Sequence, residues 1–395
     1  MPPARMHPGS GKPVAADIPL AGEVIKDKAQ DDSVEAVTVR RLLDAGLLSR
    51  RCVVDGSLRM LRTTGRNMNF VVTTGEGPAY LVKYGRGRDL SLRREAAAYS
   101  FLERVAGTEL KMALPSVVAR VRQAPILVLE YIDGRNLRGH HAQLGRCPVT
   151  WAQRCGALLA AVHEVPISAV PSALRARHGA PAFGAAIHRP DQTLFTTSSQ
   201  AVVDLIALIQ SDSALCVALD NLATDEASDA FTHQDVRWDN VLVARTAKGR
   251  LTGLRLVDWE GAVVGDPAWD VGCLFAEYLS HWVGSIPLTT IETVAQHVKL
   301  ATFSLESAQR SIAASWAGYA SSRTLGPVDA QHCLRRATRY VGYRLLQRAL
   351  EMDQLSPVVS LVAACHVQLG ARILAESDRA MTELLGFPSG SGISG

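Results

Sequence analysis

The sequence predicts an α+β chain with two lobes, a small β-rich N-terminal lobe that carries one helix and a large, mostly helical C-terminal lobe. Two apolar runs, at 70–74 and 79–84, flank the turn 75–78 and are typical of a β-hairpin. An amphipathic helix is expected at 90–105, where apolar residues recur at every third or fourth position. Beyond Gly134 the apolar spacing becomes mainly helical.

The remaining elements follow in chain order. A short helix is expected at 37–48, and a further strand at 126–132 completes a small sheet. In the C-terminal lobe, Pro and Gly mark the breaks between helices. The elements expected there are helices at 150–164, at 197–210 and over much of 268–386, and one hairpin with strands 241–243 and 254–257.

A chain of 395 residues can form two lobes with a sizeable core. Residues 1–33 carry five prolines and little periodicity, and we expect them to form a flexible leader. The N-terminal lobe is expected at 34–132 and the helical lobe at 133–386. The Gly- and Ser-rich residues 387–395 are expected to form a flexible tail.

Composition excludes several classes of protein. The apolar fraction of 47 % excludes a collagenous or wholly disordered chain. Lys and Arg number 42 against 38 Asp and Glu, and no run of five like charges occurs, so neither nucleic acid nor a membrane surface is an expected partner. The seven cysteines lack CxxC spacing, which favours free thiols in a reducing compartment. With no apolar stretch as long as a membrane span and no evident signal peptide, we expect a cytoplasmic protein.

Three motifs that carry chemistry lie within one window of 38 residues. They are His233-x-Asp235-x-x-x-x-Asn240, Asp258-Trp-Glu260 and Gly265-Asp-Pro-Ala-Trp-Asp270. Asp235 and Asn240 fall on a loop just before a strand, and Asp258 follows the partner strand of the same hairpin. Two carboxylates and an amide at one end of a sheet suit a nucleotide-bound Mg²⁺, because hard oxygen atoms hold the ion and one carboxylate can accept a hydroxyl proton.

This combination resembles the catalytic and metal-binding loops of the protein-kinase-like fold. It is most similar to aminoglycoside phosphotransferases and choline kinases, in which an Asp-Trp or Asp-Phe metal motif precedes Gly-Asp-Pro-x-x-Asp. The resemblance spans roughly residues 40–385. It implies the bilobal kinase fold, ATP and Mg²⁺ as cofactors, and an alcohol group as the phosphoryl acceptor.

The resemblance also implies roles for individual residues. Asp235 is expected to be the catalytic base, and Asn240 and Asp258 the Mg²⁺ ligands. Arg237 stands where protein kinases carry a lysine, and it either stabilises charge on the transferred phosphoryl group or braces the loop through a salt bridge. Both interpretations stay open. His233 is expected to brace the loop through hydrogen bonds.

Four further acidic residues lie close to these motifs. Asp266 and Asp270 are expected to cap the following helix and to tether the catalytic loop rather than act on substrate. Asp239 and Glu260 could supplement the metal site, but solvated roles are favoured for both. All four are therefore expected to be structural or solvent-facing.

The N-terminal lobe is expected to hold the nucleotide. Lys83 ends the second strand of the hairpin, and a lysine there would reach the α- and β-phosphates of ATP. Glu95 lies one helix turn into the next element and would hold the lysine as an ion pair. The alternative is a surface lysine and an ordinary glutamate on a helix face.

Two more segments of this lobe are candidates for nucleotide binding. The turn before the first hairpin strand contains Gly65, Arg66 and Asn67, which could cradle a phosphate although the chain lacks the GxGxxG motif of protein kinases. Its alternative is an ordinary polar turn. Glu130 and Ile132 mark the expected hinge between the lobes, where backbone groups would bind adenine.

The acceptor is harder to infer. Residues 281–395 carry ten Lys and Arg against eight Asp and Glu, which suits a polycationic acceptor poorly. A basic helix is expected at 334–348, either as a solvated face or as a groove for an acidic or phosphorylated acceptor such as a peptide. Five aromatic residues could form a choline-binding cage or belong to the core. They are Trp282, Trp316, Tyr319, Tyr340 and Tyr343.

A second resemblance concerns the acceptor. The stretches 65–72, 81–83 and 92–96 are similar to a branch of these phosphotransferases found in class V lanthipeptide and thioviridamide-like biosynthetic clusters. In that branch the kinase phosphorylates Ser or Thr of a ribosomally made precursor peptide, and a separate lyase eliminates the phosphate to leave dehydroamino acids. The resemblance implies a precursor peptide as substrate and a lyase as partner.

Three functional hypotheses remain. The first is this peptide kinase, and the second is a kinase for a small-molecule hydroxyl group on an aminoglycoside, a sugar or an amino alcohol. The third is a pseudokinase scaffold that binds nucleotide or peptide without catalysis. The third is disfavoured because Lys83, Glu95, Asp235, Asn240 and Asp258 are all present.

Overall fold

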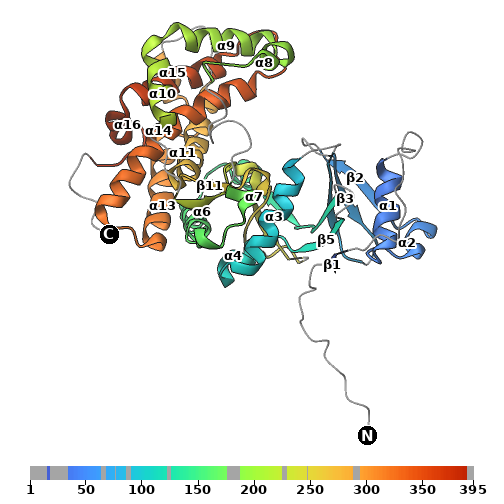
Figure 1. Cartoon of the computed structure of the whole chain (residues 1–395). Coiled ribbons are helices and arrows are strands. Elements are labelled where there is room, and N and C mark those ends of the chain that lie inside the picture. The colour runs from blue at the N-terminus through green and yellow to red at the C-terminus, as the bar shows by residue number, and fades with distance from the viewer. Residues whose placement is uncertain are drawn as a thin grey trace. The chain divides into compact units, whose positions relative to one another are not determined.

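The described residues form two compact units (Figure 1). The computed structural model describes residues 16–17, 34–63, 68–75, 77–85, 90–121, 126–175, 187–224, 229–246, 248–287 and 294–388. The first unit comprises Met1–Ser100 and Pro115–Ile132, and the second Phe101–Leu114 and Asp133–Gly395. A largely antiparallel sheet dominates the first unit and helices dominate the second, so the predicted α+β class is confirmed.

A six-stranded sheet forms the centre of the first unit. Its strands lie in the order β1-β5-β6-β4-β3-β2, and neighbours are antiparallel except that β1 runs parallel to β5. The strands are β1 Ala16–Asp17, β2 Arg59–Thr63, β3 Met68–Thr73, β4 Tyr80–Tyr84, β5 Val117–Val121 and β6 Ile126–Glu130. β3 and β4 form the hairpin that the sequence predicts, with Phe70 opposite Val82.

The two faces of this sheet have different roles. The helices of the unit are α1 Val34–Asp44, α2 Arg50–Val54 and α3 Leu90–Val105, the last of which continues into the second unit. α1 and α2 cover one face, where Leu42, Phe70 and Val82 are buried together (Figure 1). Because side chains alternate along a strand, Lys83 of β4 points to the opposite face, where it meets Glu95 of α3.

Helices make up most of the second unit. They are α4 Thr108–Met112, α5 Leu137–Leu144, α6 Val149–His163, α7 Ser172–Arg175, α8 Gln192–Thr197, α9 Gln200–Ser211, α10 Ser213–Thr224, α11 Pro267–Gly284, α12 Val294–Lys299, α13 Leu305–Arg323, α14 Pro327–Met352, α15 Leu361–Ala375 and α16 Ser377–Glu383. Three short 3₁₀ turns are described, η1 Ile167–Ala169, η2 Trp238–Asn240 and η3 Trp259–Gly261. α6 lies along α13, and α14 contacts both α11 and α15.

Two small sheets accompany these helices. Their strands are β7 Gly134–Asn136, β8 Ala230–Thr232, β9 Val241–Arg245, β10 Leu251–Leu256 and β11 Val263–Gly265. The order is β10-β9-β7 in one sheet and β11-β8 in the other, with every pair antiparallel. β9 and β10 are the predicted hairpin, and the register pairs Val241 with Leu256. This pairing brings the loop before β9 next to the loop after β10.

Several elements differ from the prediction. The helix expected at 37–48 occupies Val34–Asp44, and the one expected at 197–210 begins at Gln200 because Ser199 caps it. β2 and the three-residue strands carry too little apolar alternation to be recognised. At the start of the segment expected to be a flexible tail, Phe387 is buried against Phe275 and Trp316.

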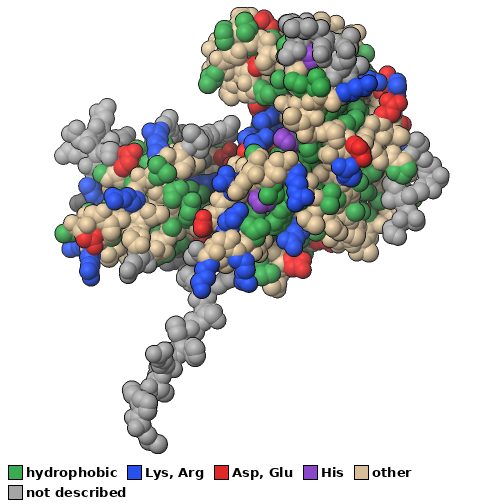
Figure 2. All heavy atoms as spheres, turned by 180° about the vertical axis from the view of Figure 1, so that it is seen from behind, with side chains coloured by type: hydrophobic (Ala, Val, Ile, Leu, Met, Phe, Trp, Pro, Cys, Tyr) green, Lys and Arg blue, Asp and Glu red, His purple; other side chains and the backbone are tan. Residues whose placement is uncertain are grey.

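All seven cysteines are free thiols, as the sequence predicts, and four of them are buried. Burial raises the pKa of the Cys155 thiol to about 12. None of the described helices is by itself both long and apolar enough to span a membrane, although α9 and most of α10, bent by 93°, reach that length and composition together. Figure 2 shows basic and acidic side chains scattered over one face, with apolar side chains between them.

The contact between α6 and α13 depends on two glycines. A Cβ atom at Gly156 of α6 would overlap the carbonyl oxygen of Ser315, and one at Gly318 of α13 would overlap the carbonyl oxygen of Gln153. The two backbones therefore approach each other more closely than a side chain would allow.

We expect Gly156→Ala to lower the free energy of unfolding by about 1–3 kcal/mol, because the added methyl group forces the two helices apart. Urea unfolding measures the change. The matched control is Gly284→Ala at the end of α11, where no described atom lies within 4 Å of the added Cβ. Equal stability of the two variants would contradict the prediction.

Candidate active site

The catalytic loop, residues 233–240, is held by a buried carboxylate. It leaves β8 and passes through Gln234, whose φ of 71° places it in the left-handed region. Asp270 of α11 is fully buried, and it accepts hydrogen bonds from the backbone N–H groups of His233 at 2.7 Å and Gln234 at 2.9 Å. Asp270 thus has the tethering role that the resemblance implies.

His163 of α6 extends this support. Its Nε2 lies 3.0 Å from Asp270 Oδ2, and its Nδ1 lies 2.9 Å from the hydroxyl of Tyr319 on α13. Because a carboxylate only accepts, Nε2 carries a hydrogen and donates it to Asp270, and Nδ1 is hydrogen-bonded to the tyrosine hydroxyl. α6, α11 and α13 are therefore linked to the loop through one chain of polar contacts.

His233 braces the loop from within. The Asp235 N–H donates to His233 Nδ1 at 3.3 Å, which assigns the ring hydrogen to Nε2. Nε2 then donates to the carbonyl of Val257 at 3.0 Å. This bond joins the catalytic loop to the segment that carries Asp258.

The structure brings Asp235, Asn240 and Asp258 to one end of the β9–β10 hairpin. The Asn240 side-chain amide donates to Asp235 Oδ2 at 2.8 Å and to the Asp235 carbonyl at 2.9 Å. The Val257 N–H donates to the Asn240 carbonyl at 3.0 Å, so Asp258 directly follows a residue bonded to Asn240. Asp258 has a φ of 68°, in the left-handed region, where η3 begins.

The donor set at this end of the hairpin fits a magnesium ion. The Asn240 amide nitrogen is engaged with Asp235, so the oxygen is the atom it can offer to a metal. With the Asp258 carboxylate this makes two hard oxygen donors, and Mg²⁺ typically takes its other ligands from phosphates and water. Within the described ranges, no three His, Cys, Asp or Glu side chains gather into a metal site of their own.

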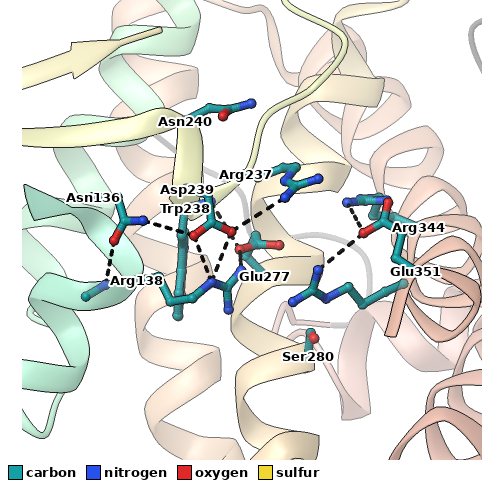
Figure 3. A network of polar contacts seen from close by, with 12 residues as sticks. Asn136, Arg138, Arg237, Trp238, Asp239, Asn240, Glu277, Ser280, Arg344 and Glu351 are labelled. Carbon is teal, nitrogen blue, oxygen red and sulfur yellow. Dashed lines mark hydrogen bonds and ion pairs between the residues drawn. The ribbon is translucent and has the colours of Figure 1, made fainter. Parts of the chain in front are cut away.

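Asp239 differs from its expected solvated role. Its carboxylate accepts from Arg138 Nε at 3.1 Å and from the Asn136 amide at 3.1 Å, and Arg237 lies 3.7 Å away (Figure 3). Arg138 also donates to Glu277 at 2.8 Å. The contact of Arg237 with Asp239 is that of a loop brace, while its 30 % exposure leaves the guanidinium accessible to a phosphate, so both interpretations remain.

Sequence reasoning missed Arg138 and Glu277. Glu277 is the signal that could have been noticed, because it is, after Asp270, the second acidic residue of the otherwise apolar helix α11, and it is only 4 % exposed. A buried carboxylate of this kind requires a cation or hydrogen-bond donors. Glu277 has both, because Arg138 is the cation and the Trp238 N–H donates a hydrogen bond to Glu277 at 3.1 Å.

In the basic helix at 334–348, at least four of the five arginines form ion pairs with acidic side chains of the chain itself. Arg336 pairs with the fully buried Asp266 at 2.9 Å, and Arg344, itself buried, pairs with Glu351 at 2.6 Å. Further pairs are Arg335–Asp378 and Arg348–Glu351. Burial alone would raise the pKa of Glu351, but the Arg344 guanidinium brings it below its ordinary value. The positive charge of this helix is therefore largely used within the molecule.

The five aromatic candidates belong to the core. Tyr340 donates a hydrogen bond to Asp266 at 2.9 Å, and Asp266 caps α11 by accepting from the Ala268 N–H. Tyr319 is engaged with His163. The whole set, Trp282, Trp316, Tyr319, Tyr340 and Tyr343, is buried, so an exposed cage for choline is not formed by these side chains.

In the first unit, Lys83 and Glu95 form a buried ion pair. Lys83 Nζ lies 2.6 Å from Glu95 Oε1, and the two side chains are 7 % and 0 % exposed. This geometry excludes the alternative of a surface lysine and an ordinary helix-face glutamate. The lysine ammonium is thus held in place on the sheet face that α3 covers.

The remaining candidates for nucleotide binding are Glu130, Ile132 and the turn that contains Gly65. Glu130 uses its N–H within the sheet, donating to the Ser116 carbonyl, and its carboxylate accepts from the Ser116 N–H. Among the described residues, no backbone hydrogen bond to the N–H or carbonyl of Ile132 is present. Gly65, Arg66 and Asn67 lie outside the described residues.

A group of histidines surrounds Trp238 of the catalytic loop. His140 and His141 of α5 are both buried, and the His141 ring lies edge-on to Trp238 at 4.5 Å. Their ring nitrogens have no hydrogen-bond partner among the described residues. Burial lowers the pKa of His141 to about 3, and the nearby His140, His281 and Arg138 act in the same direction.

This pKa shift predicts acid sensitivity. His141 stays neutral in the folded chain, whereas its ordinary pKa of 6.5 lets the unfolded chain take up a proton. The contribution of neutral His141 to the free energy of unfolding is complete above pH 6.5 and is lost as the pH falls toward 3, by about 3 kcal/mol at pH 4.5. Urea unfolding of His141→Leu should therefore show a weaker pH dependence between 7 and 4.5. The control is His332→Gln, which changes an exposed histidine. If the free energy of unfolding of His141→Leu depends on pH as strongly as that of the wild type, the prediction is wrong.

Comparison with known proteins identifies the family. The model of the phosphotransferase enzyme family (APH) matches residues 61–301, more than half of the chain. A search of curated proteins finds no match.

Solved structures that resemble the chain include three with low sequence identity. The macrolide 2'-phosphotransferase MphH from Brachybacterium faecium is 16 % identical, with a TM-score of 0.44 over 86 % of this chain and 97 % of that one. A putative fructosamine-3-kinase from Thermobifida fusca is 17 % identical, with a TM-score of 0.42 over 80 % and 92 %. A glucosamine kinase is 18 % identical, with a TM-score of 0.41 over 89 % and 84 %. By the family match, which includes Lys83, the catalytic loop and Asp258, the chain belongs to the phosphotransferase enzyme family.

Proposed function

We propose that the chain is an ATP- and Mg²⁺-dependent kinase that transfers the γ-phosphoryl group to a hydroxyl group. The observation that carries this proposal is the arrangement at the end of the β9–β10 hairpin, where Asp235 is bonded to Asn240 at 2.8 Å and Asp258 follows the partner strand. Asp235 is proposed as the base, and the Asn240 amide oxygen and the Asp258 carboxylate are proposed as metal ligands, because hard oxygen donors suit Mg²⁺. Membership in the phosphotransferase family agrees with this chemistry.

In the proposed reaction, the acceptor oxygen forms a bond to the γ-phosphorus, and the bond between that phosphorus and the bridging oxygen of ADP breaks. Asp235 accepts the proton of the hydroxyl group. The Asn240 amide orients the Asp235 carboxylate, and Asp270 fixes the backbone that carries it. Bound Mg²⁺ would neutralise charge on the phosphates.

Lys83 is proposed to bind the α- and β-phosphates of ATP. Glu95 holds the ammonium group at 2.6 Å, so little side-chain freedom is lost when a phosphate binds. The backbone of Ile132 is proposed to bind adenine. Arg237 remains either a phosphoryl-stabilising cation or a loop brace.

For the acceptor, we propose Ser or Thr of a ribosomally made precursor peptide, with a separate lyase that eliminates the phosphate. This proposal rests on the sequence resemblance to the lanthipeptide-type branch. The free thiols of the chain agree with action in a reducing compartment such as the cytoplasm.

A second candidate is a kinase for an uncharged small-molecule hydroxyl group. The ion pairs of α14 favour it, because Arg336 and Arg344 are held by Asp266 and Glu351 and do not form a basic groove for an acidic peptide. The two candidates share the catalytic loop and differ only in the acceptor.

Intact-mass analysis after incubation with Mg-ATP separates the candidates. The panel contains a Ser- and Thr-containing lanthipeptide-type precursor peptide, several aminoglycosides and several neutral sugars. One-phosphate gains on the peptide support the peptide kinase, and phosphate on a small molecule alone supports the second candidate. If no acceptor gains a phosphate, even after the lyase is added, the proposed kinase function is wrong. The pseudokinase scaffold is then the favoured hypothesis.

We expect Asp235→Asn to lower kcat by about 10²–10⁴-fold, because the amide cannot accept the hydroxyl proton. Asp258→Ala should abolish Mg²⁺-dependent turnover. Initial rates over a range of Mg²⁺ concentrations measure both effects, and thermal unfolding checks that the variants remain folded. Full activity in Asp235→Asn would exclude this residue as the base.

A further inference from the structure

Two carboxylates beside the catalytic base converge on one guanidinium group. Asp239 directly precedes Asn240, and Glu277 approaches from α11. Arg138 of α5 donates through Nε to both oxygens of Asp239 at 3.1 Å and through a terminal nitrogen to Glu277 at 2.8 Å (Figure 3). Both acidic groups are thus neutralised by a cation from the chain itself.

The surroundings of this guanidinium are those of a built cation site. Its carbon lies 5.8 Å from the centre of the Trp238 ring, within the range of a cation–π contact. Glu277 is 4 % exposed and also accepts the Trp238 N–H, so its position is fixed. Two carboxylates and an aromatic face are the groups by which proteins recognise a guanidinium or an ammonium ion.

The site is also accessible. The Arg138 side chain is 36 % exposed and Asp239 is 30 % exposed, so a ligand that replaced the arginine could enter from solvent. Arg237 adds a second positive charge near Asp239. Asp239 and Glu277 are therefore balanced by two arginines, and these two carboxylates present no net negative charge to an incoming cationic acceptor.

We propose that Arg138 occupies an acidic site beside the catalytic loop, where it positions the loop and prevents cationic acceptors from binding. The proposal deepens the kinase function stated above and rests on it. Arg138 acts through Asp239 and through Glu277, which accepts the Trp238 N–H, so it is a positioning residue rather than a catalytic one. Its removal should leave a site that an external cation can fill.

The test is replacement of the guanidinium by a small molecule. Arg138→Ala removes the guanidinium group together with its stem, so that an added alkylguanidinium ion has room to bind, while Arg138→Met keeps an unbranched stem over Trp238, removes the charge and serves for the acceptor measurement. We expect the kcat of Arg138→Ala to fall by about tenfold or more, and we expect 10 mM ethylguanidinium to restore a large part of it and to raise the melting temperature of this variant but not of the wild type. Ethylurea, which has a similar shape and no charge, should do neither. Lack of any effect of ethylguanidinium on the folded variant would overturn the proposal.

Acceptor preference gives a measurement that a merely structural role would not change. Two Ser-containing hexapeptides, identical except for one Arg replaced by norleucine, serve as a cationic and an uncharged acceptor. We expect the ratio of their kcat/KM values to shift toward the cationic peptide by about tenfold in Arg138→Met, which corresponds to about 1.4 kcal/mol. An equal loss for both peptides would overturn the exclusion of cations.

Two control variants complete the design. Arg135→Met removes an exposed arginine of the same segment, and it should behave as the wild type in every assay. Arg138→Lys retains a positive charge, and we expect it to exclude cationic acceptors as the wild type does. This variant provides the test if Arg138→Met fails to fold. If the wild type phosphorylates no acceptor, the kinase function has failed, whereas the thermal shift with ethylguanidinium still decides the occupancy of the site.

Discussion

The hydrogen bonds between the Asp270 carboxylate and the backbone of residues 233–234 are the interaction on which the candidate active site depends. Asp270 has no exposed surface, and its two oxygens are occupied by the N–H groups of His233 and Gln234 and by the ring of His163. A buried charge of this kind is tolerated only when donors surround it, and the loop supplies two of them. The conformation of the loop and the burial of Asp270 therefore stabilise each other.

This support explains how one short loop can hold groups with separate tasks. Asp235 is oriented by Asn240, and Asn240 is joined to the strand that leads to Asp258. Toward the end of the loop, Arg138 of α5 donates to Asp239 in the 3₁₀ turn η2. Arg138 also donates to Glu277, so it connects the loop to α11. The loop is thus fixed at both ends by charged side chains, and only the hydroxyl-facing carboxylate needs to change its protonation state during the proposed reaction.

Much of the fold and part of the site could be predicted from the sequence. The hairpins, α3 and the motif residues have local signals, since alternation, helical spacing and short motifs are read within a few residues. Arg138 gave no local signal, and Glu277 gave only that of an acidic residue in an apolar helix, because their partnership joins positions 139 residues apart. For the same reason, the arginines of α14 looked like a basic face, although partners such as Asp266 remove their charge from the surface.

The two glycines between α6 and α13 have a consequence for mutational scanning. His163 lies on α6 and Tyr319 on α13, and the hydrogen bond between them continues to Asp270. A methyl group at Gly156 would therefore change the distance between His163 and Tyr319 as well as the stability of the contact between α6 and α13. In a library selected for turnover, Gly156 and Gly318 would score with the catalytic residues, although neither lies in the catalytic loop. Sequence variation at such positions reports the spacing of helices rather than the chemistry of the substrate.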